Sequence, residues 1–280
     1  VRGCVHVKRR FMDSWLEQYI YFYGHTARID FKTEMDWHEH QMLVKTAFPL
    51  DILCDSADYE IQFGNVKRPT HYNTSWDKAR FETCGHKWAD MSENGYGAAL
   101  LNDCKYGYDI HDSVMRLTLL KSGIFPNPDA DQGRHTFTYA LFPHRGDFRK
   151  GRVIQEAYEL NCPLTGNWVG TGMETAGQEN ETESPPNVSC SYLTIQEENV
   201  FADTVKQAEE EDGIIIRLYE AYGKRTKAHV LLPWKGGKTA VECGCMEDEL
   251  EPVKFEQGVL ELEMRPYEIK TVKMKDRKQQ

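Results

Sequence analysis

Apolar and polar residues alternate along most of this chain, which is the pattern of β-strands with one buried face. The clearest case is residues 28–37, where Ile29, Phe31, Met35 and Trp37 alternate with charged residues. A strand of about ten residues, apolar on one face and charged on the other, is therefore predicted there.

Similar runs predict further strands, and no helical repeat or heptad interrupts them. They cover residues 5–11, 50–53, 58–64, 80–84, 96–101, 113–120, 135–144, 191–195, 214–219, 229–232, 240–245, 259–264 and 269–274. We expect Pro143 to close the strand at 135–144, because proline cannot donate to a β ladder. Residues 153–160 fit either a helix or a strand. The pattern as a whole indicates an all-β protein.

Glycines divide the last third of the chain into short apolar runs at regular spacing. They stand at Gly213, Gly223 and Gly236–Gly237. Such spacing is typical of a small β-sandwich, which we expect over residues 191–280, after a larger β domain over residues 1–190. Residues 170–188 contain few apolar residues and many of Gly, Glu and Thr, so a mobile loop is predicted there.

Composition and charge narrow the range of partners. The net charge of -10 and the isoelectric point near 5.5 argue against nucleic acid or an anionic membrane. No run of about 18 apolar residues is present, so no membrane span is predicted. The basic clusters at 8–10 and 273–278 are interpreted as solvated ends. Val1 is not methionine and opens no signal pattern, so we expect a cut inside a longer protein.

Eight cysteines are spread over the whole length of the chain. A chain of 280 residues needs no disulfides for stability, so free, buried thiols in a reducing, cytoplasmic setting are expected. The pair Cys243 and Cys245 has no second pair to complete a zinc site.

Residues 68–109 concentrate aromatic, cationic and carboxylate side chains between glycines. Trp76 with Asp77, and Tyr106 beside Gly107, offer aromatic planes next to polar groups, which is typical of sugar binding. The alternative is that these aromatic residues pack inside a sheet.

Asp36, His38 and His40 could lie together at the end of a strand and bind a metal ion. The alternative is a polar strand end, because a zinc site would need a third ligand and supporting residues from elsewhere.

Several strings in the chain are long enough to be specific. They are RIDFKT at 28–33, DWHE at 36–39, KTAFP at 45–49, YEIQFG at 59–64, RPTH at 68–71, NTSWD at 73–77, ARFE at 79–82, HKWAD at 86–90, GYG at 95–97, YGY at 106–108, residues 135–144 and 205–220, and PYEI at 266–269. Together they resemble the carboxy-terminal β region of glycoside hydrolase family 38 α-mannosidases, in the cytosolic and bacterial branch.

This resemblance implies a large β supersandwich of the galactose mutarotase type, followed by the small β-sandwich. In the family, the zinc ion, its two histidine and two aspartate ligands, the carboxylate nucleophile and the acid/base lie in an amino-terminal catalytic domain and the adjacent helical bundle. The implied enzyme hydrolyses terminal α-mannosides with retention, through a covalent glycosyl-enzyme. This chain would then contain no catalytic residue, no metal ligand and no cofactor. It would be inactive alone, shape the active-site rim and support folding, with the catalytic domain and a mannose-containing oligosaccharide as partners.

Related enzymes place an arginine near the active site after a strand that aligns loosely with residues 115–122. The matching position holds Lys121, which offers a point charge in place of a planar fork. Lys121 is therefore a substrate-proximal candidate, together with Trp76, Asp77 and Tyr106, and its alternative is a solvent-exposed lysine.

Two other functions remain open from the residues. One is a carbohydrate-binding module that uses Trp76 and Trp88 as stacking planes. The other is a free-standing aldose 1-epimerase, which needs a histidine and a glutamate as acid and base, with His86, His135 and Glu82 as candidates.

Overall fold

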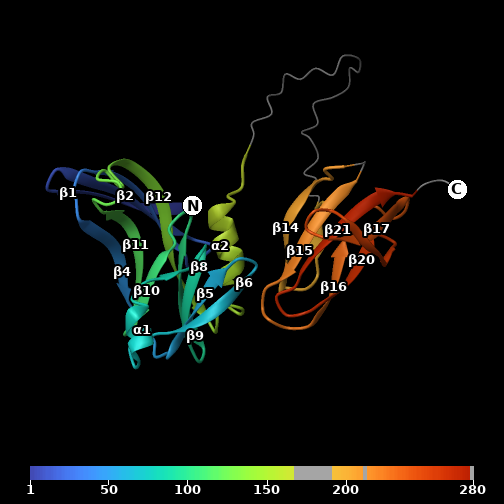
Figure 1. The fold of residues 1–280 in the computed structure, drawn as a ribbon, viewed down its shortest axis with the longest axis horizontal. Coiled ribbons are helices and arrows are strands. Elements are labelled where there is room, and N and C mark those ends of the chain that lie inside the picture. The colour runs from blue at the N-terminus through green and yellow to red at the C-terminus, as the bar shows by residue number, and fades with distance from the viewer. Residues whose placement is uncertain (167–190, 211–212, 278–280) are drawn as a thin grey trace, which may run out of the picture. The chain divides into compact units, whose positions relative to one another are not determined.

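A computed structural model describes residues 1–166, 191–210 and 213–277 of the chain. The chain divides into two compact units, residues 1–163 and 164–280. Both are built almost entirely from antiparallel strands, so the predicted all-β architecture, a large β region and then a β-sandwich, is confirmed (Figure 1). The mobile loop predicted at 170–188 lies outside the described residues.

The first unit contains two β-sheets, which we call the long sheet and the short sheet. The long sheet has eight strands, in the order β1 (Arg2–Phe11), β2 (Ser14–Tyr23), β3 (Ile29–Trp37), β12 (Gly133–Arg145), β9 (Tyr96–Asn102), β8 (Trp88–Glu93), β5 (Ser56–Ile61) and β6 (Gly64–Pro69). The short sheet has four strands, in the order β4 (Met42–Pro49), β11 (Val114–Ser122), β10 (Gly107–His111) and β7 (Thr83–Cys84).

The core of the first unit lies between these two sheets. Met35 and Trp37 of β3 contribute to it, as the alternation at 28–37 predicts. Tyr108 and Leu117 from the short sheet are fully buried in the same cluster. Each such side chain contributes roughly 1.5–3 kcal/mol by leaving water.

Two short helices complete the first unit. Residues 153–160, whose sequence fits either a helix or a strand, belong to helix α2 (Val153–Asn161). This helix buries Val153, Ile154 and Ala157 and contacts β8 and β9. Helix α1 (Ser75–Ala79) begins at a capping box, in which the side chains and backbones of Thr74 and Asp77 bond each other reciprocally.

Several predicted strands are wrong in extent. Of residues 80–84 only Thr83–Cys84 form a strand, because the turn of α1 reaches Arg80, its C-cap. Residues 58–64 contain the turn of a hairpin between β5 and β6, where Phe63 has φ 55°. Pro143 lies inside β12, opposite Ala98, and is accommodated because pairing with β3 has already ended at Leu141.

The predicted strand at 50–53 is also wrong, because side chains there replace ladder partners. The Ser113 hydroxyl donates to the Ile52 carbonyl, and the Leu53 N–H donates to the Glu93 carboxylate. Ile52 is nevertheless buried in the core, so its apolar character was a packing signal.

The second unit contains two further sheets around a core of its own. One has the order β13 (Thr194–Ile195), β16 (Thr226–Leu231), β20 (Val259–Met264) and β19 (Phe255–Glu256). The other has the order β14 (Val200–Gln207), β15 (Ile214–Glu220), β21 (Ile269–Asp276), β17 (Lys238–Cys243) and β18 (Glu249–Val253). Leu218, Val230, Leu260 and Val272 are fully buried in its core.

Cysteine exposure differs from the prediction. Every cysteine that the structure describes is free, but only Cys243 is buried. Burial raises the pKa of the Cys243 thiol. Most other thiols lie on exposed strand ends and loops, where no packing covers them. Among the described residues, no helix is both long enough and apolar enough to cross a bilayer.

Candidate functional site

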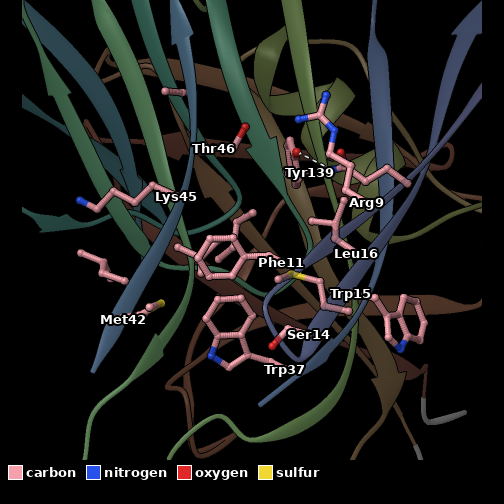
Figure 2. A pocket seen from close by; sticks show the side chains of 16 residues that line it. Arg9, Phe11, Ser14, Trp15, Leu16, Trp37, Met42, Lys45, Thr46 and Tyr139 are labelled. Atoms are coloured by element: carbon pink, nitrogen blue, oxygen red, sulfur yellow. Dashed lines mark hydrogen bonds between the residues drawn. The ribbon is translucent and has the colours of Figure 1, made fainter. Parts of the chain in front are cut away.

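A cleft of about 630 Å³ lies in the first unit, between β1, β2 and β3 on one side and the edge strand β4 on the other (Figure 2). Its walls are mainly aromatic and aliphatic, from Phe11, Trp15, Leu16, Met35, Trp37, Met42, Leu43, Val44, Leu119 and Tyr139. A concave, mostly apolar site with a few polar groups is the usual form of a binding site.

The β1–β2 hairpin and β3 position the aromatic wall of this cleft. The rings of Phe11 and Trp37 stack, with centroids 6.0 Å apart and planes 5° apart. The indole N–H of Trp37 donates to the Ser122 hydroxyl at 3.1 Å, which fixes the indole against β11. Figure 2 shows the two rings facing each other inside the cleft.

Several polar groups of the cleft are paired within the protein. Gln18 donates from Nε2 to the Tyr139 hydroxyl at 2.8 Å and to Thr33 at 3.0 Å. Burial raises the pKa of Tyr139, which stays neutral at physiological pH. Lys45 points out of the cleft, where its ammonium pairs with Glu82 at 2.7 Å and Asp109 at 3.4 Å. Ser14 also lines the cleft, and its buried hydroxyl donates to the buried Glu39 carboxylate at 2.8 Å. The lining is thus mainly apolar, with this serine–carboxylate pair and the cation Arg9 among its polar groups.

A second cavity, of about 750 Å³, is polar and lies beside β5, β6 and β8. Five carboxylates line it, those of Asp55, Asp58, Glu93, Asp112 and Asp147, together with the cations Lys67 and Arg149. The Oδ1 atom of Asp58 is buried and has no hydrogen-bond partner. Burial, reinforced by the charge of Asp90 and opposed by Lys67, raises the pKa of Asp58 to about 6.

Asp90 lies opposite Asp58 in the pairing of β5 with β8. Its carboxylate holds two side chains, because His144 Nε2 lies 2.6 Å from Oδ1 and the Ser92 hydroxyl donates to Oδ2. The Ser92 hydroxyl is bound to the Asp90 carboxylate and not to the His144 imidazole. The three side chains therefore lack the serine–histidine hydrogen bond that would activate a serine nucleophile. It connects β8 to β12.

Of the four substrate-proximal candidates, Trp76 and Asp77 lie together on one helix, and Tyr106 and Lys121 lie outside it. Trp76 is 74% exposed on α1, and Asp77 next to it serves the capping box. Tyr106 is exposed and meets the His86 ring edge-on at 5.6 Å. Lys121 is exposed near the end of β11, opposite Leu43 of β4.

Lys121 and Trp76 do not come together. Tyr72, just before α1, stacks on His111 at 3.9 Å, and His111 pairs with Val114 at the start of β11. Lys121 lies seven residues further along that strand, or roughly 23 Å at about 3.3 Å per residue.

The prediction that Trp88 offers a second stacking plane for a sugar is wrong. Only 1% of its surface is exposed, because its ring packs on Phe148 with centroids 5.0 Å apart. A sugar cannot reach it, so Trp88 is a core residue.

The predicted histidine cluster does not form a metal site. β3 ends at Trp37, and the His38 imidazole pairs with the Asp36 carboxylate at 3.1 Å. Throughout the described part of the chain, no group of three or more His, Cys, Asp or Glu side chains could hold a metal ion.

The epimerase candidates also have separate partners. Glu82 binds Lys45 and the Thr118 hydroxyl, and His135 Nε2 lies 3.0 Å from the Asp131 carbonyl. This arrangement offers no support for a histidine and glutamate acting as acid and base on one sugar.

Both cavities were missed from the sequence. The cleft follows from the order of strands in two sheets, which alternation alone does not give. The sequence predicts a strand at residues 5–11. It does not show that this strand and β2 form the end of the long sheet, beside the cleft.

Two family profiles match the chain. Residues 1–129 match the glycosyl hydrolases family 38 C-terminal domain, and residues 199–272 match the C-terminal β-sandwich domain of the same family.

Curated relatives include alpha-mannosidase G of Dictyostelium discoideum, 37% identical over 259 residues, or 91% of this chain and 23% of the relative. Human alpha-mannosidase 2C1 is 41% identical over 249 residues, or 86% of this chain and 22% of the relative. The chain thus spans less than a quarter of the length of these relatives.

The fold is similar to that of solved structures. The crystal structure of an alpha-mannosidase from Enterococcus faecalis V583 aligns with a TM-score of 0.74 at 16% identity, covering 97% of this chain and 33% of that chain. At this identity the likeness concerns the fold alone.

Proposed function

The chain belongs to glycosyl hydrolase family 38, whose two C-terminal domains it carries, and from this premise we propose that it is the carboxy-terminal β region of a retaining, zinc-dependent α-mannosidase. In this proposal the parent enzyme removes terminal α-mannosides from oligosaccharides in the cytoplasm. The observation that carries it is the 37–41% identity to named α-mannosidases along 86–91% of the chain.

The described residues do not fit the zinc ion of such an enzyme, because no suitable group of ligands is present among them. The metal ion and the nucleophile would therefore be held by the remainder of the parent protein, and this chain would take no direct part in the reaction. Its own contribution in this proposal is a β scaffold of two units, with Trp76, Asp77, Tyr106 and Lys121 as the candidate residues of the active-site rim.

The experiment compares the parent protein with the 280-residue chain on a chromogenic aryl α-mannoside in the presence of Zn²⁺. We expect release of the chromophore by the parent protein only. Release by the 280-residue chain would contradict the division of labour, and no release by the parent protein would contradict the α-mannosidase assignment.

A second candidate function rests on the exposure of Trp76. An indole that is 74% exposed and next to the Asp77 carboxylate could stack on a sugar ring. Calorimetric titration of the chain with a mannose oligosaccharide tests this function. It predicts millimolar or tighter binding that is lost in Trp76→Ala and kept in Phe81→Ala, a matched loss of an exposed aromatic residue five positions along the chain.

A further inference from the structure

The two sheets of the first unit are unequal in the part of the chain that the structure describes. The long sheet has eight strands and the short sheet has four. β1 forms one edge of the long sheet, and β4 forms one edge of the short sheet. The cleft opens between the β1–β2–β3 side of the long sheet and β4.

The cleft-facing side of the β1–β2 hairpin is apolar at most positions, and Arg9, Ser14 and Gln18 interrupt it. Gln18 marks this side, because its amide bonds Tyr139 and Thr33 beneath the short sheet. Side chains alternate along a strand, so Ile20 and Phe22 share this side with Gln18. Across the register, Val5 lies opposite Ile20 and Val7 lies opposite Gln18.

Three apolar side chains on this side are about half exposed, whereas Val7 and Ile20 are partly buried. Val5 is 50% exposed, Phe11 51% and Phe22 45%. On the other side of the hairpin, Tyr19 stacks on His6 and Tyr21 lies under the Arg2 guanidinium, so those aromatic rings are covered within the hairpin. A row of exposed apolar side chains beside an open cleft marks a surface that another element covers.

The free edge of β4 also carries backbone N–H groups that could pair with another strand. Leu50 donates its N–H to the Ser113 carbonyl, on the β11 side. Backbone N–H groups alternate between the two edges of a strand. The N–H groups of Phe48 and Thr46 therefore also point to β11, and the N–H groups of Ala47 and Lys45 point to the free edge. Lys45 does not protect this edge, since its ammonium is held by Glu82 and Asp109 on the outer side.

We propose that polypeptide preceding residue 1 in the parent protein supplies at least one β-strand that pairs with the free edge of β4 and covers the cleft-facing side of β1 and β2. This extends the short sheet over the overhanging hairpin and fills the cleft. It rests on the proposed function in one respect, that the chain is part of a longer enzyme, and the curated relatives are more than four times the length that it spans. A strand supplied in cis satisfies both observations at once, the free N–H groups and the exposed apolar row.

Residue-resolved hydrogen exchange of the full-length parent protein tests the proposal, with neighbouring amides as internal controls. We expect the amides of Lys45 and Ala47 to exchange as slowly as those of Thr46 and Phe48. Exchange at Lys45 and Ala47 that is about 100-fold faster would overturn the proposal, because it would leave this edge open to water or to a small ligand.

A paired substitution in the same full-length protein tests the apolar row. Val5→Glu places a charge on the cleft-facing side, and Cys4→Glu places it one residue away on the opposite side. We expect Val5→Glu to lower the midpoint of thermal unfolding by about 5 °C or more and Cys4→Glu to leave it nearly unchanged. Equal effects of the two substitutions would count against the covering strand.

The remaining outcomes separate the explanations. Protection at Lys45 and Ala47 that disappears on dilution would assign the edge to a second copy of the chain and overturn the proposal. Protection in a parent protein that cleaves no α-mannoside would support the strand and contradict the proposed function. An active enzyme with rapid exchange at these two amides would contradict the strand alone.

Discussion

At the scale of the residue, Asp58 shows how the environment changes the chemistry of a carboxylate. Its Oδ1 atom is buried without a partner, and Asp90 lies opposite on the next strand. Burial raises its pKa to about 6 from the ordinary value of 3.8. The folded state therefore binds a proton on Asp58 more tightly than the unfolded state does. As a result, the free energy of unfolding falls as pH rises from about 4 to about 6.

We predict that Asp58→Asn stabilises the chain at pH 7.5 by about 1 kcal/mol and has little effect at pH 4. The amide resembles the protonated acid in shape, and solvent screening of this partly exposed group keeps the gain in stability small. Urea unfolding at both pH values measures the change, with Asp55→Asn, an exposed position of the same cavity, as the control. A stabilisation that is equal at the two pH values would contradict this account.

Lys121 remains a prediction at the same scale. The side chain is exposed near the end of β11, where the backbone N–H donates to the Asp131 carboxylate and the backbone carbonyl accepts from the Gly123 N–H. In the intact enzyme, we expect Lys121→Ala to lower kcat/KM for an α-mannoside by about 10-fold if the ammonium binds a sugar hydroxyl. An unchanged kcat/KM would rule out the role, and Lys32→Ala on the outer side of β3 controls for a general effect of charge.

At the scale of the element, β9 depends on a glycine that lies against a buried imidazole. A Cβ atom at Gly97 would lie 2.5 Å from Cε1 of His144. We predict that Gly97→Ala destabilises the chain by about 1–3 kcal/mol, because the His144 ring is held by Asp90 and cannot yield. Gly3→Ala in β1 is the matched control, since nothing lies within 4 Å of its Cβ position.

Another element depends on one buried carboxylate at the end of β15. Glu220 accepts backbone N–H groups from Tyr222, Gly223, Lys224 and Tyr267, and the side-chain amide of Asn199. We predict that Glu220→Gln destabilises the second unit by about 2–4 kcal/mol, because one acceptor becomes a donor facing other donors. Denaturant unfolding followed by residue-resolved hydrogen exchange of the β15 and β21 amides measures the change, with the exposed Glu263→Gln as control.

At the scale of the whole molecule, the chain consists of two units with separate hydrophobic cores. Among the described residues, no group of side chains could hold a metal ion. The exposed apolar side chains of β1 and β2 and the free edge of β4 are the surfaces that we propose a preceding strand covers.

The sequence by itself determined the β class and many of the strands. Alternation at 28–37 and the apolar run at 96–101 depend on which face of a strand is buried, and this is written in consecutive residues. The family was also accessible, because strings such as NTSWD and HKWAD survive as local sequence. Local turns were less accessible, since the capping box of Thr74 and the φ of Phe63 override strand patterns over a few residues.

Only the tertiary structure decided the sheet order, the cleft and the polar network. Asp58, Asp90 and His144 come from three strands far apart in the chain, and their contact depends on β5, β8, β9 and β12 lying side by side. Likewise, Trp76 and Trp88 look equivalent in sequence, yet one is exposed and the other lies beneath Phe148. Burial of a side chain is a property of the elements packed around it, and residues distant in sequence supply those elements.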